Sequence, residues 1–265
     1  MGLLFLVLQA LCFFLLFQQN NFHKTIYINS SNKVVSELYA KRNKLADYLR
    51  LDEINDTLAW ENAQLKNRDS HSFVALQNDL VMIDDTILRR KYLYTSAKVI
   101  NNSVNKKSNY ITLNKGIKHG ISEGMAVVSL DKAVGIVRHV SDHFSVVLPL
   151  VNTKFQPSVK HKKSGEIGVF NWPGDQPDIA KVRDFAKYTV LQKGDSIVTT
   201  GYSAYFPEGI LIGTVSEIKN DPGDDFIQVM IDLGIEFDRL NYVNVVQNLM
   251  LDEREALEAQ VPNEE

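Results

Sequence analysis

The chain has 265 residues and a formal net charge of -3, with 45% hydrophobic and 23% charged residues. This is the composition of an ordinary globular protein, without the basic excess that nucleic-acid-binding domains carry. The only cysteine, Cys12, excludes an intrachain disulfide and a four-cysteine zinc site. The length suits one large domain, or two small domains with accessory segments.

The first segment is an apolar run, Gly2–Phe17, in which Gln9 is the only strongly polar residue. As a helix it would rise about 24 Å, slightly less than the roughly 30 Å hydrocarbon core of a bilayer. A cleaved signal peptide is disfavoured because no Lys or Arg precedes the run and no small-residue site follows it. A buried helix is also disfavoured, since a terminal helix that is apolar all round has little to pack against. We therefore expect residues 1–20 to form a single transmembrane anchor.

Residues 29–69 have the composition of a long helix, without glycine or proline and rich in Lys, Glu, Leu and Ala. Leucines recur at the seven-residue spacing of a coiled coil, with one six-residue step between Leu45 and Leu51. A lone helix with so narrow an apolar stripe buries too little surface to be stable. A solvated helix or one lying on the next domain is the alternative, but we expect a dimerisation coil. Its seam residues are Leu38, Leu45, Leu51, Leu58 and Leu65.

Residues 70–94 keep apolar residues at helical spacing and are predicted to be a helical connector. From Thr95 onward the pattern changes to short runs broken by Gly, Asp, Asn and Pro, which predicts strands without helices between them. We expect a mainly β protein with an N-terminal helix and two small six-stranded β-barrels, residues 95–155 and 156–247. The last strands could instead return to complete the first barrel. The expected strands are Ala97–Ile100, Tyr110–Leu113, Ala126–Leu130, Ala133–Val140, Ser145–Leu150, Gln156–Val159, Ile167–Phe170, Ile179–Val182, Ser196–Thr200, Ile210–Ile218, Ile227–Leu233 and Tyr242–Val246.

The final segment, residues 248–265, is acidic and has few large apolar residues after Leu251. Such a composition supplies little surface for a packed core. We predict that this tail is disordered or forms a frayed helix.

The sequence contains only weak signals of a catalytic site or a metal site. Gly194-Asp195-Ser196 resembles the nucleophile turn of chymotrypsin-like proteases, but two glycines do not follow the serine. A turn before a strand explains the same residues. His139 and His143 have a metal-like spacing, yet they fall at a strand end and in the next turn rather than on one helix. We predict no catalytic residue, no metal and no cofactor.

An aromatic cluster occupies the loop before Ile210, formed by Tyr202, Tyr205 and Phe206 with the adjacent Pro207. A plug in the core is the default interpretation of such a cluster, and an exposed partner-binding loop is the alternative. Gly213 falls inside the following strand, as at a barrel bend or a bulge.

Several strings together resemble the rod shape-determining protein MreC family. The most distinctive is Phe206-Pro207-x-Gly209-Ile210-x-Ile212-Gly213-x-Val215. The others are Gly120-Ile121-x-x-Gly124-Met125-x-Val127, Ala133-Val134-Gly135-x-Val137, Ser145-Val146-Val147 and Lys193-Gly194-Asp195-x-Ile197-Val198-Thr199-Thr200-Gly201. The order of anchor, coil and double β-domain is also similar to that family.

The resemblance implies a single-pass protein of the bacterial inner membrane with most of its chain in the periplasm. It implies a homodimer formed through the coil, further self-assembly through the β-domains, and a scaffold role in the elongation machinery that directs lateral peptidoglycan synthesis. The implied partners are MreD, MreB, RodA and a penicillin-binding transpeptidase. The barrels would resemble those of chymotrypsin without being proteases. The N-terminus lacks the charged lead usual in the family, so a natural start upstream of Met1 is one expectation.

Two other functions remain as alternatives. A periplasmic adaptor of a membrane transport complex also combines a coil with β-domains. Such adaptors usually carry a helical hairpin between barrel halves, and the single N-terminal coil argues against one here. An anchored serine hydrolase acting through Ser196 is the other alternative.

Overall fold

The computed structural model describes residues 2–19, 51, 53–69, 73–76, 87–202, 205–219 and 226–260. The chain divides into two compact units, Met1–Asp56 and Thr57–Glu265. Leu38 and Leu45, in the first part of the expected coil, lie outside the described residues. Of the expected coil over 29–69, the structure describes residue 51 and residues 53–69.

The first unit contains helix α1 (Gly2–Gln19), which covers the apolar run found in the sequence. Its exposed large side chains include Leu3, Phe5 and Phe14. Within the ranges that the structure describes, no helix combines the length and the apolar character needed to cross a membrane.

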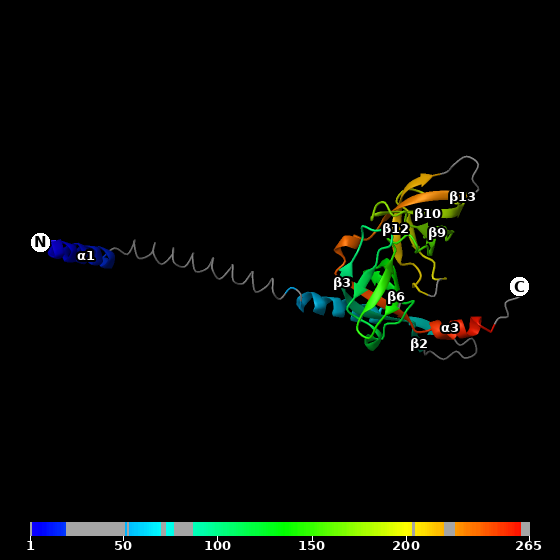
Figure 1. Ribbon diagram of the computed structural model, residues 1–265, viewed down its shortest axis with the longest axis horizontal. Coiled ribbons are helices and arrows are strands. Elements are labelled where there is room, and N and C mark those ends of the chain that lie inside the picture. Colours follow the sequence, from blue (N-terminus) through cyan, green and yellow to red (C-terminus); the bar gives the residue numbers. More distant parts are fainter. Residues whose placement is uncertain are drawn as a thin grey trace. The chain divides into compact units, whose positions relative to one another are not determined.

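The second unit begins with a helix over residues 57–68 and continues as a β structure (Figure 1). All twelve strands expected between Ala97 and Val246 are present, because each β-branched or apolar run is bounded by turn residues. Six of them are β3 (Tyr92–Asn102), β4 (Ile111–Leu113), β5 (Ala126–Ser129), β6 (Lys132–Val140), β7 (Ser145–Pro149) and β14 (Tyr242–Asn248). The other six are β8 (Ser158–His161), β9 (Ile167–Asn171), β10 (Ile179–Ala186), β11 (Ser196–Thr199), β12 (Leu211–Lys219) and β13 (Phe226–Leu233).

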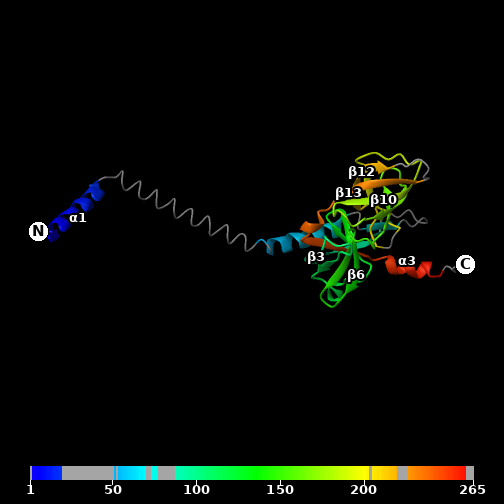
Figure 2. The same cartoon turned by 45° about the horizontal axis from the view of Figure 1, so that its top comes forward.

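The strands pair in two closed circuits of six. The order β6-β5-β14-β3-β4-β7 is closed by the pairing of β6 with β7, and β11-β8-β9-β10-β13-β12 is closed by β11 with β12. We call these circuits the first ring and the second ring. Figures 1 and 2 show β3 and β6 in one half of this unit and β10, β12 and β13 in the other. The rings meet where β12 runs parallel to β6, with Leu211 opposite Lys132.

The first ring is discontinuous in sequence. Strand β14 pairs with β3 along Tyr242–Asn248 and with β5 on its other side. A division at residue 155 therefore does not separate the rings, because the last strand returns to the first one. The sequence left this return open, since alternating apolar residues show that a strand exists but not which edge it joins.

The helical connector expected over residues 70–94 is wrong for the part that the structure describes. Strands β1 (Phe73–Leu76) and β2 (Ile87–Arg90) pair antiparallel, with Leu76 opposite Ile87. Strand β3 then begins at Tyr92. Short apolar runs fit a helix or a strand equally well, and the available pairing partner decides between them.

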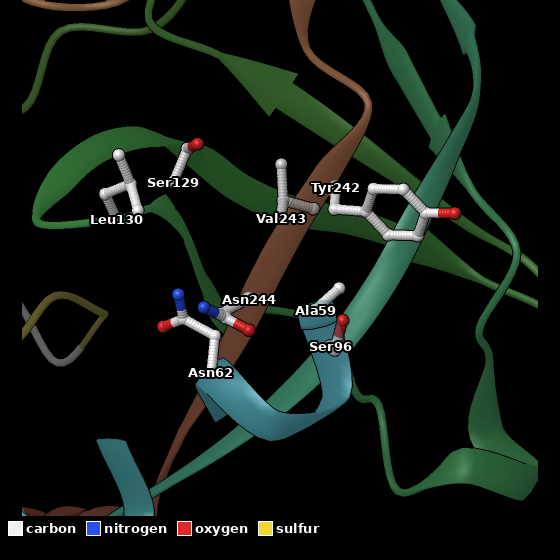
Figure 3. Close-up of a pocket in the computed structure, with 8 residues that line it drawn as sticks. All are labelled: Ala59, Asn62, Ser96, Ser129, Leu130, Tyr242, Val243 and Asn244. Carbon is white, nitrogen blue, oxygen red and sulfur yellow. The ribbon is translucent and has the colours of Figure 1, made fainter. Parts of the chain in front are cut away.

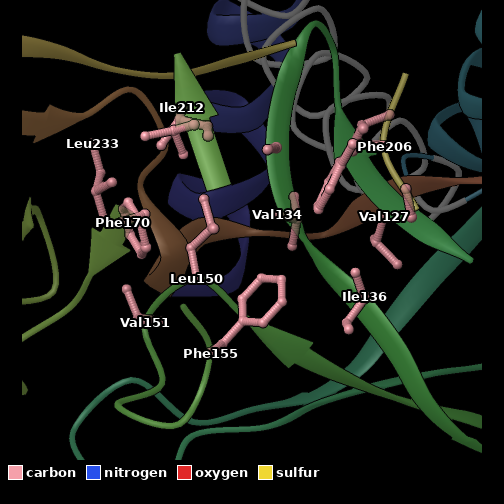
Figure 4. Close-up of a cluster of buried hydrophobic side chains, with 14 of the residues drawn as sticks. Val127, Val134, Ile136, Leu150, Val151, Phe155, Phe170, Phe206, Ile212 and Leu233 are labelled. Carbon is pink, nitrogen blue, oxygen red and sulfur yellow. The ribbon is translucent and has the colours of Figure 1, made fainter. Parts of the chain in front are cut away.

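A hydrophobic core runs through both rings as one cluster. Its largest fully buried side chains include Ile111 and Leu113 of β4 and Phe170 and Phe185 of the second ring. Figure 4 shows side chains from both rings converging, among them Val134 and Leu150 near Phe155. Apolar side chains of each ring are thus buried by the other ring, and this burial stabilises the two rings together.

Two glycines sit at bends where a side chain has no room. A Cβ on Gly213 would collide with the backbone oxygen of Asp232, and one on Gly135 with the backbone of Leu148. The β11–β12 ladder shifts register beside Gly213, and the β5–β6 ladder shifts beside Gly135. The predicted bend or bulge at Gly213 is therefore present.

Part of the acidic tail is ordered as helix α3 (Leu251–Glu258). It has no buried residue, which fits the few apolar side chains in its sequence. Of the two possibilities that the sequence left open, a short helix is the one observed for these residues.

Candidate interaction surfaces

The helix over 57–68 has two distinct faces. One face packs on the first ring through small or polar side chains, with Ala63 2% and Asn67 5% exposed. Of the expected seam leucines, Leu58 is 56% and Leu65 is 68% exposed on the other face. In the first unit, Leu51 is also largely exposed. The sequence thus identified the apolar stripe, but the face that packs on the ring carries no apolar signal.

Asn67 fastens the end of this helix to strand β3. Its amide Nδ2 donates to the backbone oxygen of Tyr94 at 3.0 Å, and the backbone N–H of Tyr94 donates to its Oδ1 at 2.7 Å. Both backbone groups of a strand residue are therefore satisfied by one side chain from a helix. We call these two bonds, with the neighbouring contacts of Lys66, the clasp.

Lys66 extends the clasp to the turn between β5 and β6. Its ammonium donates to the backbone oxygen of Leu130 at 2.5 Å and to Asp131 Oδ1 at 2.7 Å. The same ammonium lies 5.6 Å from the ring centre of Tyr94. Burial, followed by the charges of Tyr92 and Asp131, raises the pKa of Tyr94 to about 12. Sequence reasoning missed the clasp because its members are far apart in the chain and none belongs to a motif.

A small cavity lies between the helix and the first ring (Figure 3). Ala59 and Asn62 line it from the helix, Leu130 from the turn after β5, and Asn244 from β14. Its walls mix amide, hydroxyl and apolar groups without a converging set of charged groups. This cavity is therefore a gap in the packing between the helix and the first ring, and it lacks the groups of a catalytic or ligand-binding site.

The aromatic loop divides between interior and surface. Phe206 is 4% exposed and points between Val127 and Val134 of the first ring (Figure 4). Pro207 is also buried, and its carbonyl accepts a hydrogen bond from Thr199 Oγ1 at 2.6 Å. The core interpretation is thus correct for Phe206 and Pro207, and their string forms a plug from the second ring into the first.

The two tyrosines of this loop lie outside the core. Tyr202 is 75% exposed and Tyr205 is 42% exposed. The ring of Tyr205 lies over Gly124, and it lines a second cavity of about 280 Å³ together with Met125 and Leu249. These positions suit a partner-binding role, which remains a proposal for both tyrosines.

The protease-like residues are arranged differently from a serine protease. The turn expected before β11 is present, with Gly194 in the left-handed region at φ 90°. His161 lies near Asp195, with its Nε2 3.1 Å from Oδ2, but its Nδ1 contacts Ser164 Oγ at 2.8 Å. Among the described side chains, no hydrogen bond joins Ser196 to a histidine. A base within reach of the serine is the first requirement of that chemistry.

His139 and His143 have separate partners. His139 Nδ1 lies 3.5 Å from Glu123, whereas His143 Nε2 lies 3.4 Å from the ammonium of Lys118. Within the described ranges, no group of three His, Cys, Asp or Glu side chains is placed to hold a metal ion.

Asp195 is a buried acidic group of the second ring. Lys163 contacts its Oδ1 at 2.5 Å, and the backbone N–H of Gln192 donates to its Oδ2 at 2.8 Å. The hydrogen bond from Lys163, with that from Gln192, holds the pKa of this carboxyl below its usual range against the effect of burial. These partners fix the turn before β11, so Asp195 has a structural role.

Comparison with known proteins identifies the family. Residues 99–247, more than half of the chain, match the model of the rod shape-determining protein MreC, barrel core. This chain belongs to the MreC family. The matched range begins inside β3 and ends inside β14, so it includes at least part of every strand of both rings.

Relatives and solved structures agree with this assignment. The cell shape-determining protein MreC of Listeria monocytogenes is 25% identical over 201 residues, covering 75% of this chain and 65% of that protein. MreC of Cereibacter sphaeroides is 25% identical over 207 residues, covering 77% and 66%. The chain thus spans slightly less than two thirds of the length of these relatives. The crystal structure of MreC from Pseudomonas aeruginosa aligns with TM-score 0.54 at 25% identity, covering 57% of this chain and 97% of that one.

Proposed function

We propose that this chain is a cell-shape scaffold that organises lateral peptidoglycan synthesis through protein contacts. The observation that carries the proposal is the match of residues 99–247 to the MreC barrel core. Relatives that align along most of this chain are named cell shape-determining proteins. Depletion of the protein should round a rod-shaped host, and rods of normal width after depletion would contradict the role.

The scaffold is proposed to act without catalysis. Ser196 lacks a histidine partner among the described residues, and His161 contacts Ser164 and Asp195 instead. We propose that both rings are barrels of the chymotrypsin type without a protease triad. A fluorophosphonate probe should leave the protein unlabelled. Labelling of the wild type that is lost in Ser196→Ala would favour a hydrolase.

We propose that α1 anchors the chain in the inner membrane, with the rings in the periplasm. The support is the apolar run Gly2–Phe17, whose described side chains are exposed. Alkaline carbonate washing of membranes tests this, because an anchored chain stays with the bilayer. A variant with Leu6 and Leu8 changed to Lys should be released, and equal retention of both forms would contradict anchoring.

Self-association is proposed to use the leucine seam. Leu58 and Leu65 are exposed while the opposite face of their helix packs on the first ring, so the stripe is the side left available. A fully buried leucine contributes about 1.5–3 kcal/mol. The double variant Leu58→Lys, Leu65→Lys should therefore dissociate the homodimer in sedimentation measurements. A monomeric wild type would contradict the coil.

The proposed partners are those of the elongation machinery, namely a penicillin-binding transpeptidase, RodA, MreD and MreB. Tyr202 and Tyr205 are proposed to belong to a partner-binding surface because both are exposed and Tyr205 also lines a cavity. An in-cell crosslinking scan across both rings, read by mass spectrometry, tests which partner each surface meets. Crosslinks that avoid this loop would exclude it.

A further inference from the structure

The turn between β5 and β6 holds a leucine where the backbone favours a different residue. Ser129 pairs with Lys132, so Leu130 and Asp131 form a two-residue turn. Leu130 has φ 53°, in the left-handed region that such turns usually fill with Gly or Asn. Its side chain is also 62% exposed. Leucine is thus an unfavourable residue here, because its backbone conformation is strained and its apolar side chain is exposed to water.

The clasp holds this turn beside the helix. Lys66 contacts both turn residues, donating to the Leu130 carbonyl and to Asp131. Leu130 and Asn62 line the same cavity (Figure 3). On the helix surface, Asn62 lies four residues after Leu58 and three before Leu65, and is a neighbour of both. The strained leucine therefore extends the exposed leucine stripe onto the first ring.

We propose that Leu130 belongs to the self-association surface and packs against the helix of a second copy. The inference rests on the proposed self-association of the helix and adds the β5–β6 turn to it. Because the turn adjoins the stripe, a copy lying along Leu58 and Leu65 meets Leu130 as well. In a two-fold dimer the contact occurs twice.

The charges beside the three leucines favour a second copy of this chain over a charged ligand. Lys66 and Asp131 form one ion pair beside the leucines, so these two opposite charges compensate each other. The three exposed leucines are apolar, so the same side chains of a second copy can pack against them. Stable dimers also bury more than about 1,000 Å², which a narrow helical stripe reaches more readily with added contacts from the ring.

The test compares two changes at Leu130 in the full chain in detergent micelles. Leu130→Asn and Leu130→Gly remove the apolar side chain and relieve the strain of the left-handed backbone. The melting temperature of the dissociated chain, measured below the dimer dissociation constant, should therefore stay the same or rise. The dimer dissociation constant should increase at least about tenfold in sedimentation equilibrium. These opposite signs separate an interface role from damage to the fold.

Ile117→Asn is the matched control, because Ile117 is 59% exposed and precedes β5 whereas Leu130 follows it. This control should dimerise like the wild type. Unchanged dimer affinity in both Leu130 variants, with dissociation in Leu58→Lys, Leu65→Lys, would overturn the inference and leave the proposed coil intact. A wild type that is monomeric at all concentrations would overturn both.

Discussion

At the scale of single residues, two aromatic side chains of one loop have opposite environments. Phe206 is buried in the first ring, whereas Tyr202, four residues earlier, is 75% exposed. The hydroxyl of tyrosine tolerates water, and the phenylalanine ring does not need a polar partner in the core. The loop is therefore a structural plug on one side and a candidate contact surface on the other.

Phe206→Ala should destabilise the protein by about 3–5 kcal/mol, the usual cost of removing a buried phenylalanine. Tyr202→Ala, in the same loop, should change stability by less than about 0.5 kcal/mol. Urea unfolding followed by circular dichroism measures both. Equal effects of the two substitutions would contradict the assignment of the plug.

The environment of Asp195 predicts how the stability of the protein responds to acid. Its carboxyl has a lowered pKa in the folded state, so folding favours the ionised form. The stabilisation is complete above the ordinary pKa of 3.8 and is lost as the pH falls through the lower folded value. Asp195→Asn should lower the urea midpoint at neutral pH and flatten its dependence on acid.

The matched control for this change is Asp142→Asn, because the Asp142 side chain is 68% exposed beside Lys118. The control should keep the acid dependence of the wild type. An Asp195→Asn curve parallel to that of the wild type between pH 2 and about 5 would show that this carboxyl does not govern the response.

At the scale of elements, the sequence predicted where strands form better than how they assemble. The runs from β3 to β14 were recognisable because apolar alternation and turn residues are local properties. The return of β14 to the first ring depends on edges that close only in space. The helix predicted over 70–94 failed for the same reason, since β2 has a strand partner that a local pattern does not show.

The candidate surfaces show the same contrast between local patterns, which a sequence reveals, and contacts between distant segments. The leucine stripe of Leu58 and Leu65 was recognisable from its spacing, and the fold leaves it exposed. The clasp of Asn67 on Tyr94 was not, because an asparagine near a helix end has many ordinary roles. Contacts between distant segments are what a single sequence conceals.

The clasp gives a prediction at this scale. Asn67→Ala leaves the backbone N–H and C=O of Tyr94 without their side-chain partner, which should cost about 1–3 kcal/mol. The amide of Tyr94 should also exchange with solvent faster. Gln64→Ala, at an exposed position of the same helix, is the control and should change neither quantity. Unaltered exchange at Tyr94 in Asn67→Ala would show that the clasp does not hold the helix.

At the scale of the whole second unit, the two rings are joined in three ways. Their apolar residues form one cluster, β12 pairs with β6, and Phe206 reaches from the connection between β11 and β12 into the first ring. Each ring alone would expose the apolar surface that the other covers, at a cost proportional to that area. The rings should therefore unfold in a single cooperative transition.

Two local probes measure this cooperativity. In a Trp60→Phe background, the fluorescence of Trp172, which is 2% exposed, reports the second ring. Hydrogen exchange of the β14 amides reports the first ring, and both should give the same urea midpoint in the wild type. In Phe206→Ala the two midpoints should separate, because the plug between the rings is lost, whereas in Tyr202→Ala they should coincide. Separate midpoints in the wild type would show that the rings are independent domains, and the shared core would then contribute little to stability.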